Sequence, residues 1–372
     1  MLYSIVFVIL ILFMMTLKKY KIKDHDNLSL YAWFSFIILA LMSACRYQDF
    51  GSDFFRNYRH AIEAHNSSWA NVLSVDTELL HSIFRKLIVT IFPDPQAYFF
   101  VTAIIITAIA VFTIKKYSND LYLGIILFYA VFGYFSANNL TRQYLAISLT
   151  LLSWKYIIGR NPIKYSICML CAVSFHLSAM VFIPLYILSS RKFSKNFLYA
   201  YLVLSVPAIV FRSQIIRLGQ RFLYEEYGSG GYGSESSNPL RLVWVLVCIF
   251  ALWLLNTKMK REDGLIPKDY DNKDAFYFHN LICHGTVLYC FFSVLSALDM
   301  LMFSRVAAYF GQCALIALTN SPVNAPNQGN KKMVWIIIFL VAVAWFIAMN
   351  YAGKLIPTPY IPFWQVPQRP RI

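Results

Sequence analysis

The sequence predicts an all-α polytopic membrane protein, and its composition and the length of its apolar runs carry this prediction. Hydrophobic residues make up 59% of the 372 residues and charged residues only 14%, and the mean hydropathy is +0.55. Soluble domains carry about 25% charged residues. The apolar residues form runs of roughly 17–22, the length that crosses the hydrocarbon core as a helix. No ten-residue alternation of apolar and polar residues points to a transmembrane β-barrel.

We expect about 10–12 transmembrane helices in a single domain that covers residues 1–372. The first apolar run lacks a basic stretch before it and a small-residue cleavage site, so we expect a retained helix rather than a signal peptide. The seven cysteines show no metal-type pairing with histidines and fit small packing residues. The candidate spans are 1–17, 29–45, 96–114, 120–137, 140–158, 196–212, 239–256, 276–297, 302–318 and 333–350.

Short basic loops mark the cytoplasmic side of a membrane protein. If they do so here, the loop at about 257–275 is cytoplasmic, and the loops at about 46–95 and 213–238 fall on the opposite side. Within the first of these, the stretch 77–92 is too short and too charged to span, and its pattern predicts an interfacial helix. The basic markers are KKYKIK after the first span, the lysines at 115–116, GRNPIK at 159–164, SRKFSK at 190–195 and GNKK at 329–332.

One apolar stretch, at 163–189, separates two basic loops that are both predicted to be cytoplasmic. An even number of crossings must lie between them, yet the stretch is long for one helix and short for two. We therefore expect a helical hairpin or re-entrant pair with its turn at SFHLS, which would hold His176 at membrane depth. The alternative is a single tilted helix, with one basic loop assigned to the wrong side.

Arginine accumulates on the predicted extracytoplasmic side, where short loops are normally depleted of it. The net charge of +15 fits either anionic lipids or anionic substrates. Because guanidinium groups bind phosphates bidentately, the placement of these arginines favours an anion-binding site. The arginines lie in CRYQDFGSDFFRNYRH at 45–60, NNLTRQ at 138–143, FRSQIIRLGQR at 211–221 and ALDMLMFSR at 297–305.

Arg142 and Gln143 open an otherwise apolar helix. A helix start directs backbone N–H groups and the positive end of the dipole at its surroundings, so an arginine there makes a competent anion site. The alternative is an arginine that snorkels to the interface, with Asn138 and Asn139 as turn and capping residues.

The arginines near the second span have acidic neighbours. Gly51 and Ser52 predict a tight turn before a helix whose N-cap is Ser52 or Asp53. The functional interpretation makes Arg46 an anion ligand, and Asp53 a base or an organiser of arginines. Asp49 and Asp53 are a weaker candidate for a divalent-cation site, because so many arginines surround them.

Three further features allow two interpretations each. His176 is either a catalytic base or a core histidine bonded to a carbonyl. Arg305 with Asp299 either binds substrate or forms a local salt bridge. The glycine-rich stretch at 224–239 lacks the strand and the Lys-Ser/Thr of a nucleotide loop, so it either touches sugars or lipid headgroups or is a plain linker.

Five motifs occur in the order found in the EpsG-like branch of the bacterial Wzy-type polysaccharide polymerases, which this chain resembles. They are CRYQDFGSDFFRNY, NNLTRQYLAISL, FHLSAMVFIPLYIL, DMLMFSRVAAYF and PTPYIPF. The resemblance covers most of the chain from about residue 30 to 310. The first motif departs slightly from the family pattern, because four residues separate Arg46 from Gly51 and the tyrosine after Asp53 comes at Tyr58.

The resemblance implies polymerisation of lipid-linked oligosaccharide repeat units on the outer side of the bacterial inner membrane. The growing glycan would move from undecaprenyl diphosphate onto a fresh lipid-linked unit. We expect no cofactor, and no feature of the sequence supports a divalent metal. The implied partners are this lipid-linked oligosaccharide as donor and acceptor, membrane lipids, a chain-length regulator and a flippase, and no nucleic acid.

The leaving diphosphate and the attacking sugar hydroxyl define the roles we expect. Asp53, His176 and Arg142 are the catalytic candidates, and Glu225 and Asp299 are further candidates for the base. We favour a single displacement of the diphosphate by the sugar hydroxyl, which would invert the anomeric centre of the donor. The substrate-binding candidates are Arg46, Arg56, Gln143, Arg217, Arg221, Tyr227 and Arg305.

Three other functions are alternatives to the polymerase. An O-antigen ligase-like enzyme would use the same donor with a different acceptor, which the residues do not specify. A flippase or other transporter is disfavoured, because no second copy of RQ or FHxSA indicates an internal repeat. A membrane acyltransferase is disfavoured by the surplus of arginine.

Overall fold

Helices form every regular element that the computed structural model describes. The described residues are 2–19, 24–47, 53–74, 78–211, 213–214, 217, 240–257, 272–298, 301–352 and 360–366. Within them, the pairing outside helices is an isolated bridge between Arg46 and Pro362. The predicted all-α class is therefore confirmed.

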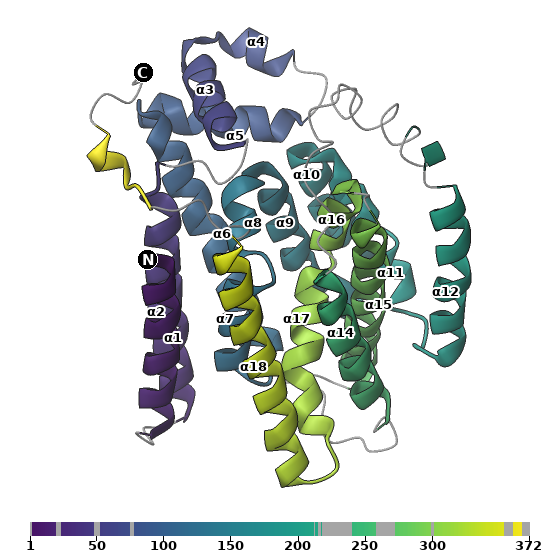
Figure 1. The fold of residues 1–372 in the computed structure, drawn as a ribbon. Coiled ribbons are helices and arrows are strands. Elements are labelled where there is room, and N and C mark those ends of the chain that lie inside the picture. The colour runs from purple at the N-terminus through teal and green to yellow at the C-terminus, as the bar shows by residue number, and fades with distance from the viewer. Residues whose placement is uncertain are drawn as a thin grey trace. The chain divides into compact units, whose positions relative to one another are not determined.

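The helices of the described residues are labelled in Figure 1 where there is room. In chain order they are α1 (Leu2–Lys19), α2 (Asp24–Ala44), α3 (Asp53–Asn66), α4 (Trp69–Leu73), α5 (Leu79–Ile91), α6 (Pro95–Tyr117), α7 (Leu121–Ala130), α8 (Tyr134–Asn139), α9 (Thr141–Ile158), α10 (Pro162–Phe175), η1 (Leu177–Phe182), α11 (Leu185–Leu188), α12 (Lys195–Val210), α14 (Arg241–Thr257), α15 (Asn272–Ala297), α16 (Leu301–Ala308), α17 (Gly311–Asn320), η3 (Ser321–Asn324), α18 (Gln328–Tyr351) and η4 (Phe363–Gln365).

Five of these helices are long and apolar enough to cross a membrane, by length and composition within the described part of the chain. A sixth candidate is the pair Met302–Ala308 and Gly311–Asn324, which is bent by 52°. All six match predicted spans, so the chain is a polytopic membrane protein. The five are Leu2–Lys19, Asp26–Ala44, Pro95–Tyr117, Lys273–Ala297 and Gln328–Tyr351, and shorter apolar helices lie at Leu121–Ala130, Pro162–Phe175, Leu177–Leu188, Tyr199–Val210 and Arg241–Asn256.

The predicted span at 120–137 is not one helix. It divides into α7 and α8 at Gly133, whose φ of 123° only glycine adopts readily. A Cβ at this position would also lie 2.9 Å from the ring of Tyr144. The resulting corner places the end of α8 directly before the start of α9.

The predicted hairpin at 163–189 is confirmed as a reversal of the chain. The helix α10 ends at Phe175, and η1 begins at Leu177, so the break falls at His176. On the two legs, the rings of Tyr165 and Tyr186 stack with centroids 4.8 Å apart. The Tyr165 hydroxyl also donates to the carbonyls of residues 182 and 183.

The chain packs into two compact units. The first comprises Met1–Ser153, Ser166–Leu177 and Ile336–Ile372, and the second comprises Trp154–Tyr165 and Ser178–Trp335. The prediction of a single domain stays a prediction.

In the first unit, α2 packs against α6, and α1 packs against α2 and α7. The short helices α3, α4 and α5 gather beyond one end of α1 and α2, where α3 and α5 pack on each other and on α6 (Figure 1). The predicted amphipathic helix at 77–92 corresponds to α5. Residues 45–47 pair with 361–363 through backbone hydrogen bonds, so the last residues of the PTPYIPF motif lie against the first residues of the first motif.

In the second unit, α15 is the central helix, with α11, α12, α14, α16 and α17 packed around it. A close approach between α15 and α17 requires Gly285, because a Cβ there would lie 2.4 Å from the sulfur of Cys313. Arg160 joins the two ends of the hairpin: it donates to the carbonyl of Tyr186 and the hydroxyl of Ser189 and lies 4.0 Å from the Tyr186 ring centroid.

Candidate active site

Glu78 lies at the centre of a polar cluster in the first unit. It directly precedes α5, and its side chain is 6% exposed. Its backbone is left-handed, with φ 56° and ψ 38°, a conformation that costs a non-glycine residue of order 1 kcal/mol or more. Backbone strain of this kind occurs preferentially at functional sites, so Glu78 is a candidate functional residue.

The carboxylate of Glu78 joins two residues that are far apart in the sequence. Its Oε2 accepts a hydrogen bond of 2.8 Å from Nη1 of Arg142, and its Oε1 lies 2.5 Å from Nδ1 of His176. The His176 side chain is 9% exposed and that of Arg142 is 29% exposed. One carboxylate thus fixes a buried imidazole and a guanidinium that is still accessible.

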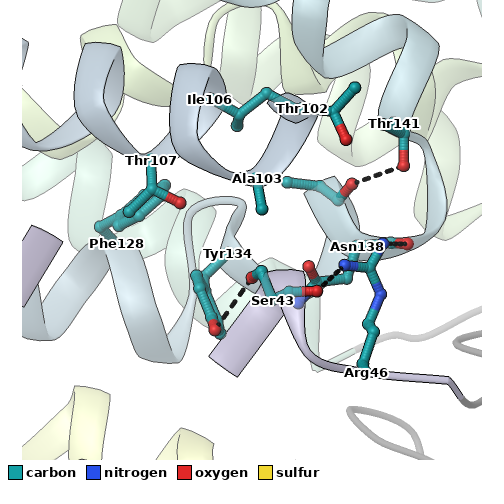
Figure 2. Close-up of a pocket in the computed structure, with 11 residues that line it drawn as sticks. Ser43, Arg46, Thr102, Ala103, Ile106, Thr107, Phe128, Tyr134, Asn138 and Thr141 are labelled. Carbon is teal, nitrogen blue, oxygen red and sulfur yellow. Dashed lines mark hydrogen bonds between the residues drawn. The ribbon is translucent and has the colours of Figure 1, made fainter. Parts of the chain in front are cut away.

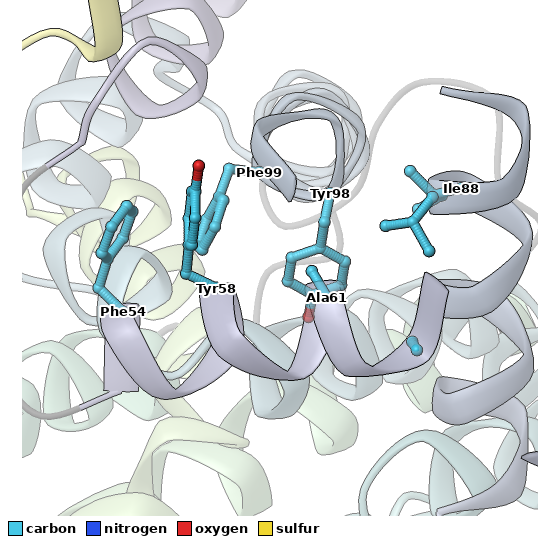
Figure 3. Packing of buried hydrophobic residues seen from close by; sticks show 8 residues of the cluster. Phe54, Tyr58, Ala61, Ile88, Tyr98 and Phe99 are labelled. Carbon is cyan, nitrogen blue, oxygen red and sulfur yellow. The ribbon is translucent and has the colours of Figure 1, made fainter. Parts of the chain in front are cut away.

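Three separate elements position this cluster. Arg142 lies in the first turn of α9, as predicted, and His176 lies at the break of the hairpin. Glu78 comes from the segment before α5, which packs on α6 and α3. Figure 3 shows the apolar cluster through which α3, α5 and α6 pack together. In this cluster, the rings of Phe54 and Tyr58 stack on Phe99, beside Tyr98, Ala61 and Ile88.

The helix α5 carries two further titratable side chains, His81 and Arg85. His81 is buried, and its Nε2 lies 2.9 Å from the hydroxyl of Tyr98. Burial lowers the pKa of His81 well below its usual value, and the charges of Arg85 and Arg142 lower it further. Burial likewise lowers the pKa of Arg85, with a smaller contribution from Arg142. His81 is therefore neutral at physiological pH.

Asp53 is the first described residue of α3; Asp49, Gly51 and Ser52 lie outside the described residues, so the predicted turn and N-cap stay predictions. Its buried carboxylate accepts a 2.7 Å hydrogen bond from Nη2 of Arg56. Its backbone N–H donates to Oδ1 of Asn139 at 3.3 Å. Asp53 thus orients Arg56 and ties α3 to the end of α8.

Arg46 follows α2 and is only 2% exposed. Its guanidinium donates to the carbonyl of Ser43 and, at 2.8 Å, to that of Asn138 (Figure 2). It also lies 5.2 Å from the Phe99 ring centroid. Burial lowers its pKa to about 10. The cavity beside it, which Ser43 and Tyr134 also line, has a volume of about 10 Å³, enough for about one water molecule.

The other predicted site residues are distributed over the chain. Gln143 is buried in the first turn of α9. In the second unit, Arg305 is half-buried in α16, and Arg217 is exposed. Arg221, Tyr227, Glu225 and Asp299 lie outside the described residues. Within the described part, no group of three or more histidines, cysteines and acidic residues could hold a metal ion.

The sequence did not single out Glu78 as a site residue. Its signal in the sequence is weak, because it is one of several charged residues in the amphipathic stretch at 77–92. In the structure Glu78 lies outside α5 with a left-handed backbone, so helical periodicity does not set the direction of its side chain. Its partners lie 64 and 98 residues away, so local sequence does not reveal their contacts.

Comparison with known proteins identifies the family. The profile of the EpsG family matches residues 29–363, which is most of the chain. Searches of curated proteins and of solved structures found no match. The matched region contains every residue of the Glu78 cluster and all the site residues predicted from the sequence. The chain therefore belongs to the EpsG family, a family of Wzy-like polysaccharide polymerases.

Proposed function

We propose that this protein polymerises lipid-linked oligosaccharide repeat units, with the Glu78 cluster as its catalytic centre. The observation that supports the proposal most is the single carboxylate that joins Arg142 to His176. The reaction needs a base for a sugar hydroxyl and a cation for a departing diphosphate. The cluster contains one group suited to each task.

His176 is the general base in this proposal. Its Nδ1 faces Glu78, so the carboxylate fixes the orientation of the ring and stabilises the imidazolium that forms. Nε2 is the ring nitrogen that takes the proton from the acceptor hydroxyl. The carboxylate of Asp53, the other predicted base, already accepts from Arg56, which favours its role as an organiser of that arginine.

Arg142 stabilises the leaving group in this proposal. The acceptor oxygen bonds to the anomeric carbon of the donor while the bond from that carbon to the phosphate oxygen breaks. The electron pair leaves with the undecaprenyl diphosphate, and its growing negative charge strengthens the contact with the guanidinium and with the N-terminal end of α9. A single displacement of this kind inverts the anomeric centre.

Other arginines support the substrate in this scheme. Arg56, held by Asp53, binds the glycan or diphosphate, and Arg46 positions the end of α8 through its bond to Asn138. We keep Gln143, Arg217, Arg221, Tyr227 and Arg305 as proposed contacts to the long substrate. No cofactor takes part in this scheme.

We propose that the protein lies in the bacterial inner membrane with the cluster facing outward, where lipid-linked units are polymerised. This placement follows from the basic loops predicted to be cytoplasmic, such as those at 159–164 and 190–195. A flippase that delivers the units and a regulator of chain length are the expected partners.

Chain extension by the purified protein tests the proposal. Full-length protein in lipid nanodiscs is given lipid-linked repeat units without nucleotide sugar, and the products are separated by size. We expect a ladder of longer lipid-linked glycans and release of undecaprenyl diphosphate. Arg191→Gln, which changes an exposed arginine outside the cluster, is the matched control and should give the same ladder.

Two outcomes would contradict the polymerase assignment. Movement of single units across the bilayer without elongation would identify a flippase. Transfer of glycan only to a lipid A core, with no extension of lipid-linked units, would identify a ligase. Deleting the gene should leave surface glycans of single repeat units, whereas loss of all units would again indicate a flippase.

A further inference from the structure

The helix η1 (Leu177–Phe182) begins directly after His176. Before the break, the backbone N–H of His176 donates to the carbonyl of Ala172 at 2.9 Å, so α10 fixes this side of the residue. On the other side, η1 is a 3₁₀ helix, whose hydrogen bonds have poorer geometry than those of an α-helix. The direction in which the chain leaves His176 therefore depends on the side chains that hold η1.

Two residues at a bend in the second unit contact η1, whose residues from Ser178 onward belong to the same unit. The helices α16 and α17 are bent by 52°, and Tyr309 and Phe310 lie at the bend, 0% and 1% exposed. The hydroxyl oxygen of Tyr309 lies 3.0 Å from Oγ of Ser178, within hydrogen-bond distance. The ring of Phe310 stacks on that of Phe182, with centroids 5.8 Å apart. The FHLSAMVFIPLYIL and DMLMFSRVAAYF motifs thus contact each other at η1.

The two contacts restrict η1 in different ways. Stacked rings remain in contact over a range of offsets, whereas a hydrogen bond between two hydroxyl groups needs oxygens about 2.5–3.0 Å apart and weakens steeply with angle. Ser178 lies two residues after His176, so its hydrogen bond with Tyr309 sets the path of the chain just beyond the imidazole. The proposed function uses Arg305 of the later motif and gives Tyr309 no role.

We propose that Tyr309 is a positioning residue, whose hydroxyl holds Ser178 and thereby keeps the imidazole of His176 in the orientation that takes the proton from the acceptor hydroxyl. This inference rests on the proposed function, because it assigns part of the support of the proposed base. A displacement of a reacting group by about 1 Å can cost about 100-fold in rate. A single hydroxyl that does not touch the substrate can therefore control the rate of chain extension.

Tyr309→Phe tests the inference, because it removes the hydroxyl and keeps the buried ring. Chain extension is measured in nanodiscs over a range of concentrations of lipid-linked units. We expect kcat to fall about tenfold or more and KM to change less than about twofold, since the hydroxyl supports the base rather than the binding of substrate. Tyr129→Phe is the matched control: it removes an equally buried hydroxyl, which donates to the carbonyl of Tyr3, and should leave kcat and KM unchanged.

Changes at Ser178 separate this hydrogen bond from other effects of Tyr309→Phe. Ser178→Ala should lower kcat as much as Tyr309→Phe does, and the double variant should be no slower than either single variant, because both changes remove the same interaction. Ser178→Thr keeps the hydroxyl and should keep most of the wild-type rate. Hydrogen exchange gives a readout without catalysis: the amides of residues 177–182 should exchange about tenfold faster in Tyr309→Phe and Ser178→Ala, but not in Tyr129→Phe.

A wild-type kcat in Tyr309→Phe would overturn the inference, and so would losses that multiply in the double variant or unchanged exchange at residues 177–182. If the wild type extends chains and any of these results is found, only the role of Tyr309 is refuted. A wild type that extends no lipid-linked unit would refute the proposed function, and with it the positioning of a base.

Discussion

Arg46 and Arg142 are two arginines of the same unit, each next to the end of an apolar helix, but their surroundings differ. Arg46 is 2% exposed and donates to two backbone carbonyls, whereas the Arg142 side chain is 29% exposed and donates to a carboxylate. The guanidinium of Arg46 is buried and uses its N–H groups to stabilise the backbone. The guanidinium of Arg142 is oriented by a carboxylate and is still accessible, so it can bind a ligand. Burial and the type of acceptor, rather than the presence of arginine, distinguish these two roles.

The largest effect is expected at His176, the partner of Arg142 on Glu78. Changing His176→Ala removes the proposed base, so the rate of chain extension should fall by about 10²–10⁴-fold. The rate is measured with saturating lipid-linked units in nanodiscs. Asp53→Asn, which alters the rival base, is the comparison. A greater loss in Asp53→Asn than in His176→Ala would assign the base to Asp53.

Arg142 should show the next largest effect. Arg142→Ala removes the proposed stabilisation of the leaving diphosphate, and extension should slow by about 10²–10³-fold. Arg142→Lys keeps the charge but not the planar fork, so it should recover only part of the rate. The unfolding temperature of both variants is measured in parallel. Full extension by Arg142→Ala would show that the diphosphate binds elsewhere.

Replacing Arg46 should lower the stability of the protein rather than the rate of chain extension. Arg46→Met keeps the length of the side chain but leaves two buried carbonyls without their donor, which should lower the free energy of unfolding by about 2–4 kcal/mol. Molecules that remain folded should extend chains at close to the wild-type rate. A variant of normal stability that cannot extend chains would instead make Arg46 the diphosphate ligand that the sequence suggests.

The smallest effect is a pH dependence from His81, whose neighbours include Arg85, Arg142, Glu78 and His176. Burial keeps His81 neutral in the folded protein, whereas in the unfolded chain it takes up a proton near pH 6.5. The contribution of His81 to the free energy of unfolding is therefore constant above about pH 6.5. Below about pH 6.5, His81 lowers the free energy of unfolding, by up to about 2 kcal/mol at pH 5.

The comparison of wild type with His81→Gln isolates this contribution from those of the other histidines. The unfolding temperature, measured in detergent, should fall more steeply for the wild type than for His81→Gln as the pH is lowered from 7.5 to 5. Parallel curves for the two proteins would show that His81 becomes protonated in the folded state.

Much of the fold could be predicted from sequence, because hydropathy and charge act locally. Apolar runs predicted the long helices, and the two basic loops around 163–189 predicted a reversal that the contact between Tyr165 and Tyr186 confirms. The corner at Gly133 was not foreseen, because the apolar run from 120 to 137 continues through it.

The candidate site could be predicted only in part. Arg142 and His176 stood out because each is a polar residue beside an apolar run. Glu78 did not, since its importance depends on contacts with two distant segments and on a left-handed backbone. The hydrogen bonds of Arg46 to backbone carbonyls could not be predicted either. Every residue has a carbonyl, so the sequence does not indicate which carbonyl accepts the hydrogen bond.

Glu78→Gln tests the central role of the cluster most directly. The amide keeps the size of the side chain but removes the charge that holds Arg142 and His176 together. Chain extension by the folded variant should slow by about 100-fold or more, the loss expected when both a base and an electrostatic contact are disturbed, and Arg191→Gln should extend normally. A Glu78→Gln protein that unfolds at the wild-type temperature and extends chains at the wild-type rate would contradict the assignment of this cluster as the active site.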